Sequence, residues 1–303
     1  MSVPSLLPAA LALGLAPLLV GVITRTKAVI AGRVGQPLLQ PYRDLRKLMR
    51  KGAVYSRTTT WVFRAGPVVG LAATVLASAL VPYGGSFALV SFPGDLFVFA
   101  YLLALTRFFT VIAALDTGSS FEGMGASREV TFSALAEPTL LLGLAAVART
   151  TGSLSLSPIL SRVTVEVWAQ AAPALALVAA AFLVVFLVEN GRIPVDDPAT
   201  HLELTMIHEV MILDHGGPDL AFILYAAAVK LWLLGTLLIG VVLPVHSDNR
   251  WLDSAAATVA MLALGVLTGL IESSMARLRL VRVPNLLVGA GVLSVLALLL
   301  VLR

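Results

Sequence analysis

Residues 167–188 read VWAQAAPALALVAAAFLVVFLV, and residues 189–218 continue as ENGRIPVDDPATHLELTMIHEVMILDHGGP. The first stretch is long and apolar enough to cross a bilayer as a helix, which takes about 20 such residues. The second is a charged loop interrupted by prolines, and it holds His201, His208 and His215, three of the four histidines of the chain. A membrane protein keeps such dense charge beside a span where the charge serves a function, so this loop is the first candidate for a site.

The composition places the whole chain in a membrane. Of its 303 residues, 58% are hydrophobic and only 13% are charged, whereas a soluble domain carries about 25% charged residues. We therefore predict an all-α, polytopic membrane protein with one transmembrane domain over residues 1–303. The chain has no cysteine, which excludes a disulfide, an iron–sulfur cluster or a thiolate metal site. Its basic residues follow a membrane topology, so the pI near 9.7 does not indicate nucleic-acid binding.

Eight apolar runs have the length of a membrane span. They cover residues 6–23, 65–81, 96–115, 130–147, 167–188, 220–243, 255–271 and 286–302. No Lys or Arg precedes the first run, which favours a span over a cleaved signal peptide. The runs show no internal repeat, so the sequence gives no support to an inverted-repeat transporter.

The loops between these runs alternate in basic charge. One set carries Arg25, Lys27, Arg33, Arg43, Arg46, Lys47, Arg50, Lys51, Arg57, Arg128, Arg192, Arg277, Arg279 and Arg282. The opposite side carries Arg149, Arg162, Arg250 and Arg303, in plain connectors of Gly, Ser and Pro. The positive-inside rule then predicts that both termini face outward and that the first set of loops is cytoplasmic. Because every unusual segment lies on that side, we predict a docking platform for cytoplasmic partners.

The first cytoplasmic loop, residues 25–61, predicts an amphipathic helix. Arg43, Arg46, Lys47 and Arg50 share one face of it at helical spacing, and Leu45, Leu48 and Met49 lie on the other. A helix of this kind binds anionic lipid, with about 1 kcal/mol from each basic residue near the surface. It is also suited to seat a soluble subunit, and the sequence leaves both interpretations open.

Acidic residues enter the predicted spans from the cytoplasmic side. The candidates for a proton path are Asp116, Glu122, Glu129, Glu137, Glu189 and Lys230. Glu129 and Glu137 are eight residues apart, which places them on similar faces of a helix about 12 Å apart. An ionised carboxylate in a bilayer faces a water-filled cavity or a partner, or is held neutral. The alternative is a local ion pair, since Arg107, Arg128 and Lys230 are available to neutralise these acids.

The loop at 189–218 predicts a rigid turn followed by a short helix. Asp196 and Asp197 lie between Pro194 and Pro198, which break a helix. Asp197 or Thr200 is then placed to cap a short helix that runs to about residue 213.

The histidines of this loop do not predict a metal site. His201 and His208 are seven residues apart, roughly 10 Å along a helix, which is too far for one zinc ion. A histidine–carboxylate network that passes protons or locks a subunit contact is one interpretation, and simple backbone hydrogen bonds are the other. The arginines of segment 272–284 either dock a partner or only set the topology. The candidate docking and coupling residues are Arg128, Arg192, Asp196, Asp197, His201, Glu203, His208, Glu209, Asp214, Arg277 and Arg279.

Several motifs resemble a known family. GRVGQP at 32–37, LQP at 39–41 and the run ENGRIPVDDP resemble the subunit 1 family of respiratory complex I. GMGASRE at 123–129, AEPTL at 136–140 and PVDDPATHLELTMIHE at 194–209 are more similar to the homologous membrane subunit of energy-converting nickel–iron hydrogenases, the formate hydrogenlyase subunit 4 type. The resemblance covers nearly the whole chain, and the last stretch is its most specific part.

This resemblance implies a subunit of the prokaryotic cell membrane that docks a soluble redox arm and couples it to proton or sodium movement. The implied partners are hydrogenase-like large and small subunits, which carry the nickel–iron centre and the iron–sulfur clusters, and antiporter-like membrane subunits. The quinone-reducing branch usually has acids where Ala199 and His201 stand, and a Glu-Tyr-Ser-Gly run where residues 214–217 read DHGG. These departures argue against a quinone site. Quinone-dependent turnover would favour that alternative, and solute uptake by the isolated chain would favour a stand-alone transporter.

Overall fold

The computed structural model describes residues 3–196, 206–244, 247 and 249–303. In these ranges eight helices are long and apolar enough to cross a membrane. They are α1 (Val3–Ile30), α3 (Trp61–Ser78), α4 (Asp95–Asp116), α5 (Ser120–Thr151), α7 (Val165–Glu189), α8 (Gly217–Val242), α9 (Arg250–Ser274) and α10 (Val283–Leu302). The shorter elements are α2 (Gln40–Leu48), α6 (Leu156–Ser161) and the 3-10 helices η1 (Glu209–Ile212) and η2 (Leu280–Arg282). The prediction of an all-α, multi-pass membrane protein with eight spans is confirmed.

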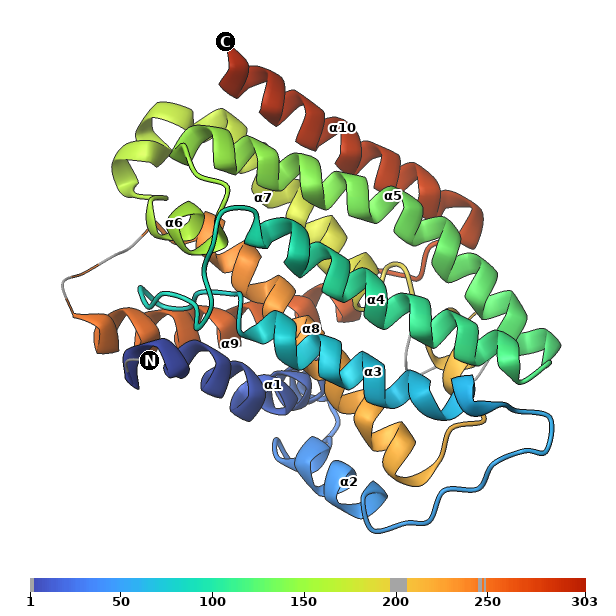
Figure 1. The fold of residues 1–303 in the computed structure, drawn as a ribbon. Coiled ribbons are helices and arrows are strands. Elements are labelled where there is room, and N and C mark those ends of the chain that lie inside the picture. The colour runs from blue at the N-terminus through green and yellow to red at the C-terminus, as the bar shows by residue number, and fades with distance from the viewer. Residues whose placement is uncertain (1–2, 197–205, 245–246, 248) are drawn as a thin grey trace.

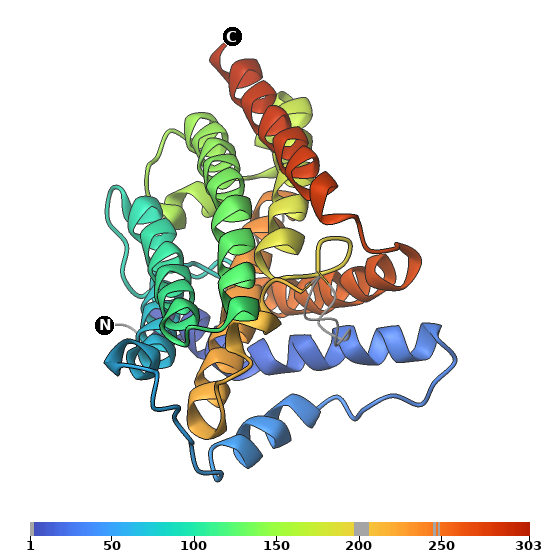
Figure 2. The same ribbon diagram turned by 90° about the vertical axis from the view of Figure 1, so that its right-hand side faces the viewer.

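The helices form two groups that meet at α8. Helices α3, α4, α5 and α10 lie side by side in that order (Figure 1), and α7 packs against α5, α10 and α8. Helix α1 packs along α9, and Figure 2 shows this pair crossing the direction of α5 and α10. Helix α2 contacts α1 and α8 and lies outside the bundle.

Helix α5, which contains the fourth predicted span, begins earlier than the sequence predicted. Helix α5 begins at Ser120, whereas the apolar run begins at residue 130. The extra turns are polar, but they bury Glu122, Gly125, Ala126 and Glu129 against neighbouring segments. This part of the helix is therefore stabilised by tertiary contacts that hydropathy does not register.

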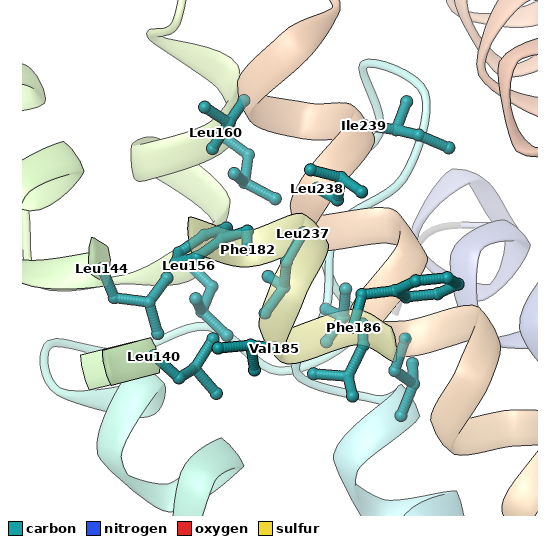
Figure 3. Close-up of a cluster of buried hydrophobic side chains, with 14 of the residues drawn as sticks. Leu140, Leu144, Leu156, Leu160, Phe182, Val185, Phe186, Leu237, Leu238 and Ile239 are labelled. Carbon is teal, nitrogen blue, oxygen red and sulfur yellow. The ribbon is translucent and has the colours of Figure 1, made fainter. Parts of the chain in front are cut away.

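The apolar core lies between α5, α6, α7 and α8. Figure 3 shows side chains of all four elements in contact. The labelled ones are Leu140, Leu144, Leu156, Leu160, Phe182, Val185, Phe186, Leu237, Leu238 and Ile239. Lipid tails are as apolar as these side chains, so van der Waals packing rather than transfer from water holds them together.

The connectors from α3 to α4 and from α5 to α7 carry more structure than the expected plain loops. The carboxylate of Asp95, at the start of α4, is fully buried and accepts bonds from the Ser155 hydroxyl at 2.6 Å and the Leu156 amide at 2.7 Å. These bonds seat α6 against α4. Burial raises the pKa of Tyr83 to about 12 in the neighbouring loop. The bonds of Asp95 thus fix this end of the bundle.

The short helix predicted before residue 213 is only a 3-10 turn in its described part, η1. The Asp196 carboxylate accepts the amides of Ile207 at 3.0 Å and His208 at 3.2 Å, just before η1. The Asp196 side chain thus caps backbone amides eleven and twelve residues further along the chain. Because these bonds satisfy the amides of Ile207 and His208, the segment before η1 is held as a turn. The proposed caps Asp197 and Thr200 lie outside the described residues.

Candidate functional site

The guanidinium of Arg107 in α4 is the centre of a buried ionic cluster. Its Nε lies 3.1 Å from Glu129 Oε1, and its Nη2 lies 2.7 Å from Glu189 Oε1. Its Nη1 bonds Glu137 Oε1. The Arg107 side chain is only 9% exposed, so all three contacts lie in a medium that screens charge weakly. One cation therefore serves three carboxylates from α5 and α7.

A second cation completes the cluster. Lys230 Nζ, from the middle of α8, lies 3.3 Å from Glu189 Oε2. Two cations then face three carboxylates, so the cluster carries an excess negative charge when every group is ionised.

Local packing places Arg107. The Thr106 hydroxyl lies 3.1 Å from the carbonyl of Leu102 within α4 and 3.3 Å from the carbonyl of Gly70 in α3. The bonds turn this polar side chain towards α3 and hold the two helices together. The next residue, Arg107, then projects towards α5 and α7. Arg107 is thus positioned by α4, its own helix, and by α3, which contributes no charged residue to the cluster.

A histidine joins this cluster to the loop that follows α7. His208 Nε2 lies 3.2 Å from Glu129 Oε2, and His208 Nδ1 lies 3.7 Å from Asp196 Oδ2. Burial acts to lower the pKa of His208, but the Glu129 carboxylate and then Asp196 outweigh it and raise that pKa. For Asp196, burial is again the opposing effect, and His208 holds the pKa of the carboxyl below its usual range. Arg277 Nη2 lies 3.0 Å from the other Asp196 oxygen.

Two glycines allow the histidine to approach. A Cβ at Gly125 of α5 would lie 2.3 Å from Val210 and 3.0 Å from the carbonyl of Ile207, so only glycine lets η1 pack there. Glu129 is one turn further along the same face, which brings it to His208. Gly191 has a φ of +56°, and a Cβ there would lie 2.7 Å from His208 Nδ1. Gly125 and Gly191 thus leave the space that allows His208 to contact Glu129.

A second ionic cluster ties the same loop to α1 and α9. Glu272, whose side chain is fully buried, lies 2.8 Å from Lys27 Nζ and 3.5 Å from Arg192 Nη1. The amide of Leu278 donates to the carbonyl of Pro194 at 2.8 Å. The first part of the loop after α7 is therefore bound to the end of α9 and to the segment that follows it.

Two cavities meet at the Arg107 cluster. The larger, of about 490 Å³, has apolar walls from α1, α3 and α8. Its charged lining consists of Lys27, Arg107, Glu129, Glu189, Arg192, Asp196, His208, Glu209, Lys230 and Glu272. The smaller, of about 200 Å³, is lined by Arg107, Glu137 and Glu189 together with apolar residues of α4 and α5. Arg107 and Glu189 line both, so their ion pair separates the two spaces.

Among the predicted proton-path residues, Glu129, Glu137, Glu189 and Lys230 come together and two others do not. Asp116 accepts the amide of Thr60 at 2.6 Å and caps the start of α3. Glu122 accepts the amide of Asp214 at 3.2 Å and holds the turn after η1. Both contacts are structural, and neither carboxylate contacts the Arg107 cluster.

The predicted docking residues are distributed between internal contacts and the surface. Arg128 donates to the carbonyl of Met206 at 2.8 Å, so it holds the loop rather than the acids beside it. Arg192, Asp196, His208 and Arg277 are engaged within the chain, as described above. Glu209 lines the larger cavity, whereas Asp214 and Arg279 are exposed. Asp197, His201 and Glu203 lie outside the described residues.

Sequence reasoning missed two charged members of the site. Lys27 and Glu272 were not predicted as functional, because each lies near the end of a span, where charge is ordinary. Arg107 was considered only as a neutralising partner, although a cation within an apolar run is itself a signal. In the part of the chain that the structure describes, no group of three or more His, Asp or Glu side chains is arranged to hold a metal ion.

Comparisons with known proteins agree with the motifs. Residues 4–302 match the sequence family described as NADH dehydrogenase. Formate hydrogenlyase subunit 4 of Escherichia coli (strain K12) is 34% identical over 292 residues, which cover 93% of this chain and 92% of that protein. Hydrogenase-4 component C of the same organism is 30% identical over 279 residues, 90% of this chain and 87% of that protein.

The likeness extends to a solved structure. A chain in the structure of the membrane-bound sulfane sulfur reductase, an archaeal respiratory membrane complex, superposes with a TM-score of 0.82. That match covers 98% of both chains at 21% identity and shows the common fold.

Proposed function

Because this chain belongs to the NADH dehydrogenase family, we propose that it is the membrane-anchoring and coupling subunit of a hydrogenase-like complex, of the formate hydrogenlyase type. It docks a soluble redox arm on its cytoplasmic side and links electron transfer there to the movement of protons or sodium ions. The metal centres belong to the soluble partners, a nickel–iron large subunit and an iron–sulfur small subunit. Antiporter-like membrane subunits are the further neighbours. Both termini face outward in the prokaryotic cell membrane.

The observation that carries the proposal is the continuous row of ionisable groups from the loop to the membrane interior. It runs from Asp196 through His208 to Glu129, and then through Arg107 to Glu137. Histidine is the group in this row that gains or loses a proton near neutral pH. A change in the position of the loop would therefore act on the buried carboxylates through one titratable contact, that of His208 with Glu129.

The cluster supplies a coupling step with this chain's own residues. His208 gives a proton to Glu129, which weakens the hold of Glu129 on Arg107. The guanidinium then binds Glu189 and Glu137 more tightly, because it is shared among fewer anions. Loss of the proton from Glu129 to the larger cavity, which Glu129 and His208 both line, and uptake of a proton by His208 restore the first arrangement. Movement of the loop by a docked partner would bias this exchange by changing the distance from His208 to Glu129.

Purification of the complex through a tag on this chain tests the assignment. We expect nickel, iron–sulfur protein and hydrogen-dependent activity to be recovered in the same preparation. Recovery of the chain with no metal-bearing soluble subunit would refute the proposal.

The coupling role has a separate test. Glu129→Gln and Glu137→Gln should each impair ion movement driven by the redox reaction, while the complex still assembles. Ion movement equal to wild type in both variants would remove these carboxylates from the path.

One observation favours a second candidate, a quinone-reducing complex. The larger cavity has the size of a ligand site, with apolar walls and a charged end at Asp196 and His208. A quinone ring at that end would be hydrogen-bonded by His208, and its tail would lie along α1 and α8. Quinone-dependent turnover without hydrogen exchange would decide for this candidate. The sequence departures at Ala199, His201 and residues 214–217 argue for the hydrogenase-like complex instead.

A further inference from the structure

The cluster around Arg107 attracts a cation, and its geometry decides which kind. Three carboxylates face the two cations Arg107 and Lys230, so the cluster is short of positive charge when every group is ionised. In a weakly screening interior that excess acts on any cation that reaches the larger cavity. A proton and a sodium ion have the same charge, but they differ in what they require of the surrounding oxygen atoms.

Arg107 occupies the place where a metal ion would need its ligands to converge. Its Nε, Nη1 and Nη2 contact Glu129, Glu137 and Glu189 respectively. A guanidinium is planar and directs its donors outward, so the three carboxylates lie around it instead of facing one common point. A hard cation takes several oxygen ligands at once. In the described part of the chain, no group of three or more His, Asp or Glu side chains provides such a set.

The second oxygens of the two buried acids are also occupied. Glu129 Oε2 lies 3.2 Å from His208 Nε2, and Glu189 Oε2 lies 3.3 Å from Lys230 Nζ. A sodium ion at either oxygen would have to displace a basic side chain and would gain one carboxylate in exchange. A proton needs only one lone pair of one oxygen, and it can pass between His208 and Glu129 over the contact that already exists.

The position of Arg107 between the two cavities extends the exclusion to both. Arg107 and Glu189 line the larger and the smaller cavity, so a metal ion in either space meets the guanidinium. In the smaller cavity the other acid is Glu137, which is already bound to Arg107. Arginine stays charged in proteins, so this repulsion cannot be relieved by loss of a proton. A lysine at the same place could lose its proton and would not form a permanent barrier.

From these observations we propose that Arg107 determines the ion selectivity of the cluster, because it admits protons to the carboxylates and excludes sodium ions. The inference rests on the proposed function, since it chooses between the two ions that remain open there for the part of the path within this chain. Arg107 is a specificity-determining residue in this role and takes no part in the proton exchange itself. Any sodium movement by the complex would then take place in the neighbouring membrane subunits.

Sodium binding to the purified full-length chain tests the inference directly. In detergent at constant ionic strength, with choline replacing sodium, the wild-type melting temperature should be the same in both salts. Arg107→Gln leaves the carboxylates with Lys230 and His208 and adds a neutral amide oxygen, so sodium should stabilise this variant. The expected rise in its melting temperature is about 3 °C when sodium is in roughly tenfold excess over its Kd. Equilibrium dialysis with radioactive sodium should show saturable binding to Arg107→Gln and none to wild type.

Two control variants assign the effect to the cluster. Arg107→Gln combined with Glu189→Gln removes one of the exposed ligands, and it should lose most of the sodium effect. Arg64→Gln removes a cation outside the cluster, one that lies 4.3 Å from the centre of the Tyr55 ring, and it should leave the chain without sodium binding. A sodium effect in Arg64→Gln equal to that in Arg107→Gln would overturn the inference.

The wild-type measurement decides the inference even where a variant fails to fold. Saturable sodium binding to the wild-type chain that Glu129→Gln abolishes would show that the cluster accepts sodium with Arg107 in place, and the inference would be wrong. A folded Arg107→Gln chain that binds no sodium would equally overturn it, because Arg107 would then not be the group that excludes the ion.

These outcomes are separate from those that test the proposed function. If metal-bearing soluble subunits accompany the wild-type chain and its cluster binds sodium, the coupling subunit stands and only the choice of ion is wrong. If no such subunit accompanies the chain, the proposed function fails, while the sodium measurement still decides what the cluster binds.

Discussion

Removal of the Arg107 charge is the most informative perturbation of this protein. Arg107→Gln keeps a hydrogen-bonding side chain but leaves Glu189 with Lys230 and Glu129 with His208 as the remaining basic partners. Glu129 and Glu189 are 8% and 6% exposed at their side chains, so water cannot replace the lost guanidinium. Breaking a buried ion pair from one side costs about 3–5 kcal/mol. Glu137 is more exposed, so the loss of its contact with Arg107 adds less to this cost.

This cost is large enough to measure in the purified complex. For a chain of this size it corresponds to a fall in melting temperature on the order of 10 °C. The assay is the fraction of the detergent-solubilised complex that stays monodisperse after stepwise heating. Arg107→Lys keeps a cation but loses the guanidinium that contacts three carboxylates. Its melting temperature should therefore lie between those of wild type and Arg107→Gln.

A compensating variant separates charge from packing. Arg107→Gln combined with Glu189→Gln removes one cation and one anion, and it should recover part of the lost stability. The cluster is not held by its charge balance if Arg107→Gln has the melting temperature of wild type. The same conclusion follows if the double variant loses more stability than the sum of the losses of the two single variants.

Three further predictions concern the contacts around the loop. Burial acts to lower the pKa of His208, but its carboxylate neighbours outweigh burial and raise it, so the stability that His208 contributes is complete below about pH 6.5 and is lost as the pH rises through the raised value. The melting-temperature gap between wild type and His208→Gln should therefore shrink as the pH rises above about 6.5, and a pH-independent gap would contradict this. Gly125→Leu places side-chain atoms where Val210 lies and should destabilise the chain by about 1–3 kcal/mol, seen as faster protease cleavage near η1, with unchanged cleavage counting against it. Lys27→Glu and Glu272→Lys should each lower the melting temperature and together restore much of it, whereas an additive loss would show that the pair does not interact.

The spans were predictable because their signal is local. Each apolar run is read from composition alone, and all eight are helices in the structure. The start of α5 was not predictable, since residues 120–129 are polar and form helix only because η1 packs on Gly125. The turn before η1 was misjudged for the same kind of reason: Asp196 caps it from outside the segment.

The site was predictable by residue type but not by partner. Glu137 stands out as a charge inside an apolar run, and Glu129 and Glu189 directly adjoin apolar runs. Their meeting at Arg107 joins residues 22, 30 and 82 positions away, which no spacing rule anticipates. Lys27 and Glu272 lie near opposite ends of the chain, and their contact depends on the packing of α1 along α9. Asp116 and Glu122 looked equivalent to the other acids and instead cap local structure.

The position of Glu137 bears on how the subunit is made. Its side chain is 42% exposed near the midpoint of α5, on the flank of the bundle. In the proposed complex a neighbouring membrane subunit would cover this side chain, and a newly inserted copy would present an acid to lipid until then. Synthesis of this chain and its neighbours must then be balanced, and surplus copies become substrates for membrane proteases. Co-expression, rather than higher expression of the single gene, is the route by which such a subunit accumulates.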